Sequence, residues 1–343
     1  MKKILFIADL NTYGRSYLRY KNLISMGYSL TSISHMPIAK DKKIKKPSLI
    51  YRISNKLSIP LDVTNINKSI LQVLKKQHYD IIWIETCISI FPSTLKKIKF
   101  KYTESKLISL SEDDMFPSHN NSIWYKLGLK YFDFVYTTKV HNLEDLKLFK
   151  GKNITLFLDS FDSNLHKPVK LNKEDKSYYG CDVSAIGAYE EERAQTLLFL
   201  ANKKIKVSVW GNGWQKFINI HPFLNIKNKF LYSEEYVKAI NASKINLNFL
   251  RKINRDQITS RSMEIPACNG FMLAERTPRH KTFFKEGVEA EFFGNDTELL
   301  CKVNFYLKNS DKRIAIANLG YQRCIKSGYS MAAQLKIIIN KTL

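Results

Sequence analysis

Phe249 to Thr277 reads FLRKINRDQITSRSMEIPACNGFMLAERT, and this stretch carries the strongest indication of the fold. It holds four arginines, one lysine and three acidic residues, and it ends in the apolar run FMLA and a polar ERT. That order predicts a polar loop, a helix capped by Thr259 or Ser260, a turn over 268–270 and a buried parallel strand. Open α/β sheets place ligands at the carboxyl ends of their strands, so polar residues around this helix are candidates for a binding site.

The charged residues of the stretch fit a ligand that carries both phosphate and hydroxyl groups. Arg251, Arg255 and Arg261 can hold phosphate oxygens through paired hydrogen bonds, and the start of a helix adds N–H donors. The carboxylate of Glu264 only accepts hydrogen bonds, which suits two ribose hydroxyls. These residue types indicate a site for the diphosphate and ribose of a sugar nucleotide. The alternative is an ordinary surface pair between Arg261 and Glu264, in a helix that Pro266 keeps short.

Strands and helices alternate along the whole chain, which is typical of α/β proteins with parallel sheets. The predicted strands lie at 2–8, 28–34, 79–86, 106–111, 132–139, 153–158, 181–187, 204–211, 245–250 and 271–274. No GxGxxG follows the first strand, so the usual dinucleotide fingerprint is missing. The polar stretch 164–175 predicts a linker between two Rossmann-like domains, 1–165 and 176–329.

Three further turns carry candidate residues. The strand at 181–187 ends in Gly187 before the sequence AYEEER, and a glycine there lets the backbone approach a diphosphate. The next strand ends in the turn Gly211-Asn212-Gly213, and FMLA is followed by Glu275. The candidate donor-binding residues outside the arginine-rich helix are Gly187, Tyr189, Arg193, Asn212 and Glu275.

The strand at 106–111 ends in three acids, Glu112, Asp113 and Asp114. A carboxylate at the tip of a strand can act on an acceptor hydroxyl as a base or as an orienting group. Three adjacent like charges are costly without partners, which favours a function. The alternative is a solvated turn before Pro117.

Composition limits the classes of protein. With 44% hydrophobic and 25% charged residues, the 343-residue chain is globular, and no apolar run reaches the length of about 20 residues that spans a bilayer. The start MKKILFIADLN predicts a first strand rather than a signal peptide. Five dispersed cysteines indicate reduced thiols in the cytoplasm and no structural zinc.

The net charge of +24 calls for an anionic partner: nucleic acid, an anionic membrane surface or a phosphate-bearing substrate. No helix-turn-helix, zinc or RNP-type signature supports nucleic acid. The run KDKKIKK at 40–46 is either a solvated loop or a contact with a membrane or acceptor phosphate.

Six segments resemble the CgeB-like (spore maturation protein type) glycosyltransferases: SEDDMFPSHNNS, YFDFVYTTKVHNLEDL, CDVSAIGAYEEERA, VSVWGNGW, the stretch from YVKAINASK to FMLAERT, and EGVEAEFFGNDTELLCKVNFYL. The most specific part is RSMEIPACNGFMLAERT. The resemblance implies an α/β protein of GT-B fold, with two facing Rossmann-like domains and a cleft between them. It also implies a donor site in the C-terminal domain, no bound metal, and a last helix, 330–343, that packs back on the N-domain.

Many related retaining enzymes carry an E-x7-E motif, and this sequence has Asp256 and Glu264 at those two positions. By that likeness Glu264 holds the ribose, Asp256 approaches the donor sugar, and Arg251, Arg255 or Arg261 neutralises the diphosphate. Aspartate at the first position is one methylene shorter than the motif's glutamate, so the stereochemical outcome stays open.

The resemblance implies metal-independent transfer of a hexose from a nucleotide sugar, most readily a UDP-sugar, to a hydroxyl of a bacterial surface glycan or glycolipid. Asp114 would be the base of an inverting reaction or would orient the acceptor in a retaining one, with Asp256 and Arg261 as the other catalytic residues. The implied location is the cytoplasm, or the inner face of the cell membrane. A catalytically inactive nucleotide-sugar-binding or assembly protein of the same fold is the alternative.

Overall fold

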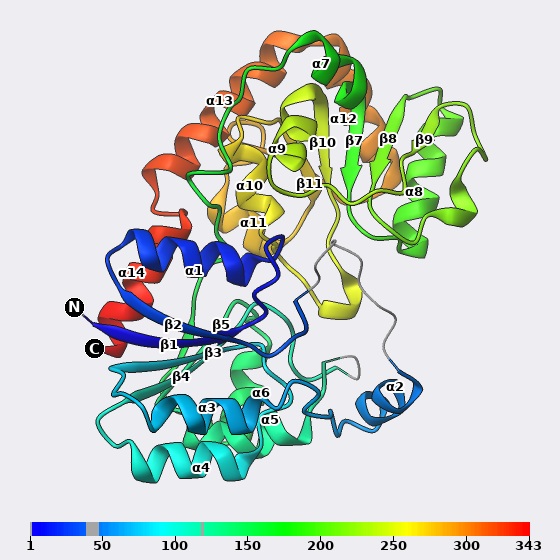
Figure 1. The fold of residues 1–343 in the computed structure, drawn as a ribbon. Helices are drawn as coiled ribbons and strands as arrows, with labels where there is room; N and C mark the ends of the chain where they lie inside the picture. Colours follow the sequence, from blue (N-terminus) through cyan, green and yellow to red (C-terminus); the bar gives the residue numbers. More distant parts are fainter. Residues whose placement is uncertain (1, 39–47, 118–119) are drawn as a thin grey trace. The chain divides into compact units, whose positions relative to one another are not determined.

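The computed structural model describes residues 2–38, 48–117 and 120–343. These form two compact units (Figure 1). Unit 1 runs to Leu158 and includes the C-terminal segment Met331–Leu343, whereas unit 2 is Asp159–Ser330. The predicted linker, 164–175, falls inside unit 2 by this division.

Unit 1 is built on one parallel sheet in the strand order β2-β1-β3-β4-β5-β6. Its strands are β1 (Lys3–Ala8), β2 (Ser29–Ser34), β3 (Ile81–Glu85), β4 (Lys106–Ser111), β5 (Phe134–Thr137) and β6 (Ile154–Leu156). Its helices are α1 (Arg15–Ser25), α2 (Leu49–Lys56), α3 (Ile66–Leu74), α4 (Pro92–Lys101), α5 (Ile123–Gly128), the 3-10 turn η1 (Leu129–Tyr131), α6 (Asn142–Leu148) and α14 (Met331–Thr342).

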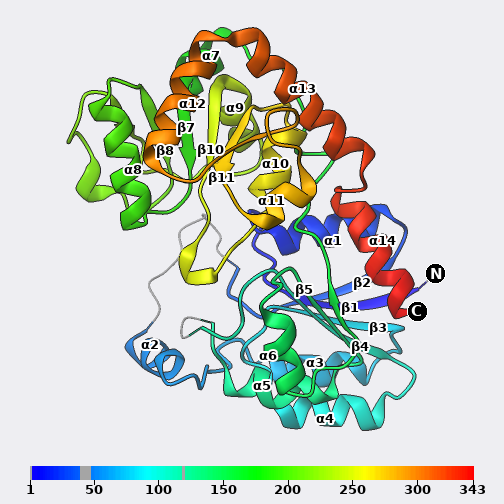
Figure 2. The same ribbon diagram turned by 180° about the vertical axis from the view of Figure 1, so that it is seen from behind.

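Both faces of this sheet are covered by helices (Figures 1 and 2), so its strands are apolar on both sides. In β1, Leu5 and Ile7 join one buried cluster, while Ile4 and Phe6 join another that includes residues of α14. The hydroxyl of Tyr136 donates to the carbonyl of Ile338 at 3.1 Å and thereby ties α14 to β5.

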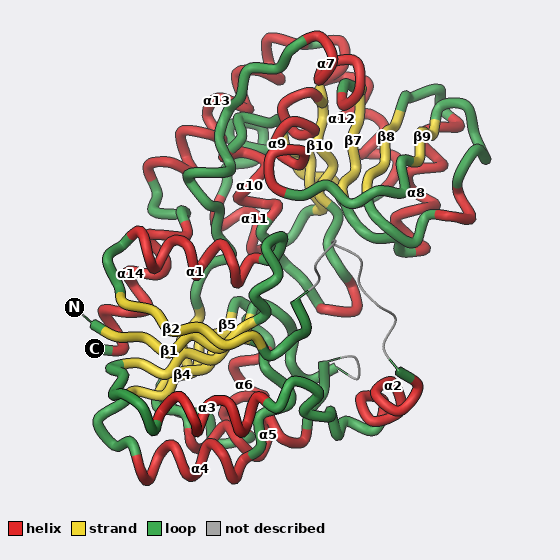
Figure 3. The backbone as a smooth tube through the Cα atoms, in the orientation of Figure 1, coloured by secondary structure: helices red, strands yellow, loops and turns green. Residues whose placement is uncertain are grey.

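Unit 2 repeats the arrangement with the strand order β12-β11-β10-β7-β8-β9, again parallel throughout. Its strands are β7 (Cys181–Ile186), β8 (Val207–Trp210), β9 (Leu224–Ile226), β10 (Ser243–Asn248), β11 (Met272–Glu275) and β12 (Glu291–Phe293). Its helices are α7 (Lys173–Tyr179), α8 (Glu191–Asn202), α9 (Ser233–Ala242), α10 (Arg261–Ala267), α11 (Pro278–Phe283), α12 (Asp296–Lys308) and α13 (Ser310–Lys326), with 3-10 turns η2 (Gln215–Phe217) and η3 (Lys252–Asn254). Figure 3 shows helices on both sides of each sheet.

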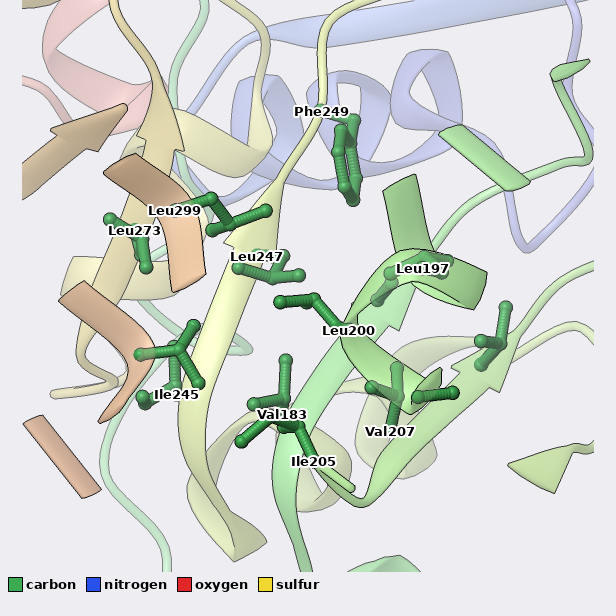
Figure 4. Close-up of a cluster of buried hydrophobic side chains, with 14 of the residues drawn as sticks. Val183, Leu197, Leu200, Ile205, Val207, Ile245, Leu247, Phe249, Leu273 and Leu299 are labelled. Carbon is green, nitrogen blue, oxygen red and sulfur yellow. The ribbon is translucent and has the colours of Figure 1, made fainter. Parts of the chain in front are cut away.

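The core of unit 2 lies between the sheet and helices α8 and α12. Val183, Ile245 and Leu247 from the strands meet Leu200 and Leu299 from the helices (Figure 4). The alternate residues of β10, Asn246 and Asn248, point to the opposite face. The predicted α/β class with two parallel sheets is confirmed.

The strand order locates the point in each sheet where the chain reverses direction. In unit 2 the chain leaves β7 toward β8 and β9 and later returns to the other side of β7 as β10. In unit 1 the corresponding point lies between β1 and β3. Because neighbouring loops diverge at such a point, the carboxyl ends of β7 and β10 are the expected place for a ligand in unit 2.

Candidate functional site

Two glycine turns at the carboxyl ends of β7 and β8 are held together by backbone hydrogen bonds. Gly187 donates its N–H to the carbonyl of Trp210 at 2.8 Å, and its own carbonyl accepts from the indole N–H of Trp214 at 2.9 Å. A Cβ on Gly211, which has a φ of 142°, would lie 2.0 Å from the carbonyl oxygen of Gly187. Only glycine fits this approach, and both indoles are fully buried as core residues.

Tyr189 and Asn212 belong to the same pair of turns. The N–H of Tyr189 donates to the carbonyl of Asn212 at 2.9 Å. The ring of Tyr189 packs edge-on against Trp214, and its hydroxyl bonds Glu191. Asn212 is exposed and therefore supports the turn through its backbone, while its amide faces solvent.

Two arginines from different helices converge on Gly187. A Cβ on this residue would lie 2.7 Å from Nη1 of Arg193 and 3.6 Å from Nη2 of Arg261. Arg193 lies in the first turn of α8, and Arg261 is the first residue of α10. The absent side chain of Gly187 thus leaves room for two guanidinium groups next to exposed backbone at the reversal point of the sheet.

Arg193 carries a buried charge that its neighbours only partly compensate. The residue is 7% exposed; its Nη1 donates to the carbonyl of Ala188 at 2.5 Å, and Nη2 lies 3.7 Å from Glu190. Its Nε is buried and has no hydrogen-bond partner among the described residues. Burial, together with the nearby charges of Arg261 and Arg251, lowers the pKa of Arg193 to about 10 against the opposing effects of Glu190 and Glu275. An anion would satisfy this site.

A cavity of about 430 Å³ opens beside these groups within unit 2. It is lined by three of the predicted residues, Arg193, Asp256 and Glu275, together with the apolar Phe249 and Leu250. Glu275 accepts the backbone N–H of Leu250 at 2.9 Å, and burial raises the pKa of its carboxyl group. The volume lies in the range of small-molecule sites.

The loop between β10 and α10 carries the remaining arginines. Nε of Arg251 lies 3.4 Å from Glu190, and its carbonyl accepts the N–H of Asp256 at 3.2 Å. Arg255 is exposed and has a left-handed backbone with a φ of 49°. The structure therefore groups Arg251 with Arg193 and Arg261, and it places Arg255 in the turn that ends η3.

The start of α10 differs from the prediction. Ser260 stands at the N-cap position, but neither its hydroxyl nor that of Thr259 caps the helix. Instead the N–H groups of Ser262, Met263 and Glu264 bond the carbonyls of residues 259 and 260. The predicted cap was wrong because a preceding turn supplies backbone acceptors, so positive charge at this end comes mainly from the Arg261 side chain.

The turn predicted over 268–270 follows α10. The left-handed residue is Asn269, with a φ of 58°, and the N–H of Gly270 bonds the carbonyl of Ile265 at 3.0 Å. Gly270 is needed for another reason: a Cβ there would lie 2.7 Å from Ile240.

Glu264 is buried, 6% exposed, and is held by residues that the sequence did not mark as its partners. The hydroxyl of Tyr236 donates to its Oε2 at 2.8 Å, and Nε2 of His166 lies 3.9 Å from its Oε1. The backbone N–H of Asp162 donates to Nδ1 of His166, so the ring proton sits on Nε2 and faces the carboxylate. Burial and the charge of Glu264 hold the pKa of Tyr236 well above its usual range.

A buried polar chain supports the region from the side of α11. His280 is fully buried; its Nδ1 donates to the carbonyl of Glu275 at 2.7 Å, and its Nε2 accepts from the hydroxyl of Ser262 at 2.8 Å. The side-chain amide of Asn248 donates to the same hydroxyl oxygen at 2.9 Å. This chain connects the ends of β10 and β11 to α10, and thereby fixes the three segments that carry candidate residues.

Asp114 in unit 1 has no exposed surface. Its Oδ1 accepts from the amide of Asn142 at 2.7 Å, and its Oδ2 lies 3.0 Å from Nε2 of His141. The side chain of His141 is 21% exposed, so it is the member of this pair that solvent reaches. Nothing in the sequence pattern marks His141, because the pairing depends on β4 and β5 being neighbours.

The first acid of the predicted trio has a different role. Glu112 pairs with Arg15, at 2.9 Å to each of two guanidinium nitrogens, and with Arg19 at 2.8 Å. Arg19 also forms two 2.7 Å bonds to Glu85. The run 40–46 lies outside the described residues.

The described residues, 2–38, 48–117 and 120–343, contain no group of three or more His, Cys, Asp or Glu side chains arranged as a metal site would need. They also contain no helix with the length and apolarity required to cross a bilayer.

Comparisons with known proteins agree with this arrangement. Residues 193–340, less than half of the chain, match the sequence model of a family described as glycosyl transferase-like. The chain resembles the sucrose-phosphate synthase of Thermosynechococcus elongatus over 99% of both chains, with a TM-score of 0.69 and 10% identity. It resembles Anabaena Alr3699/HepE in complex with UDP-glucose over 100% of both chains, with a TM-score of 0.65 and 12% identity.

A glycosyltransferase from Rickettsia africae ESF-5 matches over 99% of this chain and 97% of its own, with a TM-score of 0.64 and 13% identity. No curated protein matches the sequence. The fold is therefore GT-B, and Arg193, Arg261 and Glu264 lie within the residues that match the glycosyl transferase-like model.

Proposed function

We propose that the protein is a glycosyltransferase of the CgeB-like type that transfers a hexose, without a bound metal, from a UDP-sugar to a hydroxyl of a bacterial surface glycan or glycolipid. The observation that carries this proposal is the convergence of Arg193 and Arg261 on Gly187, with a buried guanidinium N–H lacking a partner among the described residues. The UDP-glucose complex of the Anabaena protein supports a UDP-sugar as the donor.

In this proposal the arginine cluster does most of the catalysis. Cleavage of the donor's glycosidic bond builds negative charge on the departing diphosphate, and cations already fixed beside it stabilise the transition state more than the ground state. Arg193, Arg261 and Arg251 supply that charge, and the turns at Gly187, Tyr189 and Asn212 form the wall of the diphosphate site. Glu264 accepts from the ribose hydroxyls, while Asp256 and Glu275 line the cavity that takes the sugar. Arg255, in the loop before α10, adds positive charge for the diphosphate.

We assign the acceptor side to the pair Asp114–His141. A carboxylate without exposed surface does not reach a substrate, so Asp114 acts by orienting His141 and by stabilising the imidazolium formed when the ring takes the acceptor proton. In a retaining reaction the same pair would only orient the acceptor hydroxyl. An acceptor carried by a lipid places the enzyme on the cytoplasmic face of the membrane, where a chain of +24 is attracted to anionic lipid.

The test is calorimetric titration with UDP-, GDP-, ADP-, TDP- and CMP-sugars, with Mg²⁺ and with EDTA. Wild type should bind one nucleotide equally well in both conditions. Glu264→Ala should bind it about ten- to a hundredfold more weakly, since two hydrogen bonds to a charged group are lost. Lys244→Ala is the matched control, because Lys244 is exposed at the opposite, amino end of β10.

Binding alone does not separate an enzyme from an inactive binding protein. Slow hydrolysis of the bound donor, lost in Arg261→Met, identifies the enzyme. Tight binding without any turnover of donor would favour the inactive alternative, and no binding of any nucleotide would overturn the proposal.

A further inference from the structure

Helix α2 of unit 1 presents its apolar side to solvent. Leu49 is 68% exposed, Ile50 is 71%, Ile53 is 51%, and Leu57, the residue after the helix, is 65%. No residue of α2 is buried. In Figures 1 and 2 the helix projects from the side of its unit.

The exposed side chains occupy one face. At 3.6 residues per turn, these four aliphatic residues fall within an arc of about 100°. The opposite side holds the polar Ser54 and Asn55 with Tyr51, and these three are the less exposed residues of the helix. A helix on a globular protein normally packs its apolar side inward. The orientation of α2 is inverted, so its apolar face needs a partner outside unit 1.

The exposed apolar face of α2 continues into the segment that follows the helix. Ile59, 44% exposed, follows in extended chain. This segment is fixed to α5, because the N–H of Ile123 donates to the carbonyl of Ser58 at 2.9 Å and the indole of Trp124 donates to the carbonyl of Pro60 at 3.1 Å. We call Leu49, Ile50, Ile53, Leu57 and Ile59 the α2 surface.

Charge indicates what covers this surface. Arg52 and Lys56 are exposed and border the apolar arc on one side. The chain carries +24, and five lysines precede α2 within 40–46, outside the described residues. A stripe of leucine and isoleucine bordered by cations is the pattern of helices that lie at the interface of an anionic bilayer.

We propose that the α2 surface docks the protein on an anionic lipid bilayer, with its leucines and isoleucines at the acyl boundary and with Arg52 and Lys56 among the headgroups. This inference does not depend on the donor site, because it rests on an inverted amphipathic helix in the other unit. It goes beyond attraction by net charge, since it names the apolar contact that would hold the protein in place.

The experiment measures co-sedimentation with vesicles of phosphatidylglycerol and phosphatidylethanolamine, and with vesicles of phosphatidylcholine alone. Wild type should bind the anionic vesicles, and added salt should weaken binding. Ile50→Asp/Ile53→Asp should bind the anionic vesicles at least about tenfold more weakly. Two aliphatic side chains that would enter the bilayer are replaced by negative charges, which the anionic lipid repels. The control Phe100→Asp/Leu148→Asp makes the same change of charge at two apolar positions of unit 1 that are at least as exposed, and it should bind as wild type does.

Three results would overturn the proposal. The α2 variant could bind as well as the control, or both vesicle types could bind wild type equally. Alternatively, light scattering could show a dimer that the α2 variant loses, with no vesicle binding, which would assign the face to a second copy of the chain. Nucleotide titration of the α2 variant should match wild type, so failure of this inference is distinguishable from failure of the donor site.

Discussion

Arginines gather at the carboxyl edge of each sheet, but their partners differ. In unit 1, Arg19 is bonded to Glu85 and Glu112, and Arg15 shares Glu112. In unit 2, Arg193 lies 3.7 Å from Glu190, and two further arginines are its neighbours. Figure 1 shows both sheets, β1 to β6 and β7 to β12, with their separate sets of loops.

The pKa values of the buried arginines, Arg19 in unit 1 and Arg193 in unit 2, shift in opposite directions. Burial alone lowers the pKa of a guanidinium group, but Glu112 and Glu85 more than offset it and raise the pKa of Arg19 above its ordinary value. At Arg193 the carboxylates of Glu190 and Glu275 offset burial only in part, and the pKa falls to about 10. Removing one partner of a matched buried ion pair destabilises the fold, whereas a buried arginine without matched carboxylates suits an anionic ligand.

The largest effect should follow from removing the matched arginine. Arg19→Met leaves Glu85, which has no exposed surface, with only the indole N–H of Trp83 at 3.0 Å. Unit 1 should lose about 3–5 kcal/mol of its free energy of unfolding, which is the cost of breaking a buried pair. Hydrogen exchange of the β1 and β3 amides measures this loss in unit 1 alone, and UDP-sugar affinity should not change.

A double variant checks the cause. Arg19→Met/Glu85→Gln removes the uncompensated carboxylate and should recover part of the loss. If the double variant is as unstable as Arg19→Met, packing of the arginine stem and not charge accounts for the effect.

In unit 2, His280 is a buried side chain with both ring nitrogens hydrogen-bonded, and its effect on stability depends on pH. Burial lowers the pKa of His280 from 6.5 to about 4. Between these two pH values the histidine is protonated in the unfolded chain but not in the folded protein. The free energy of unfolding therefore falls by about 3 kcal/mol as the pH drops from about 6.5 to 4. Urea unfolding at several pH values measures the slope. His280→Asn should flatten it, and an unchanged slope would assign the dependence to other groups.

Removing the unmatched arginine should show the reverse of Arg19→Met. Arg193→Met should weaken UDP-sugar binding by about 2–3 kcal/mol, roughly 30- to 150-fold, because charge-assisted bonds to the diphosphate are lost. Stability should stay within about 1 kcal/mol of wild type, since a buried charge is removed with its desolvation cost. If Arg193→Met loses stability and keeps its affinity for the UDP-sugar, Arg193 has the same structural role as Arg19, and the proposed difference between the two arginines is wrong.

Much of the fold followed from the sequence, because fully buried parallel strands are continuous apolar runs. The strand at 106–111 was predicted at its observed bounds. Strands β9 and β12, three residues each, were missed because so short a run gives no periodicity. Helix α2 was missed because its apolar residues face no core.

The sequence supplied candidate site residues but not the contacts between them. Arg193 and Arg261 stood out by type and position, yet their meeting over Gly187 depends on β7 and β10 being neighbours. His141 and His166 are single residues outside any motif. They become candidates only through their tertiary contacts with Asp114 and Glu264.

The smallest predicted effect concerns the residue that holds Glu264. Tyr236→Phe removes one hydrogen bond to Oε2 and should weaken UDP binding by about 1 kcal/mol, roughly fivefold. Binding of 2′,3′-dideoxy-UDP should hardly change, because a ligand without ribose hydroxyls does not use that carboxylate. The ratio of the two affinities separates orientation of Glu264 from general damage, which would weaken both ligands alike. Tyr178→Phe, an exposed tyrosine on α7, is the matched control and should leave both affinities and their ratio as in wild type.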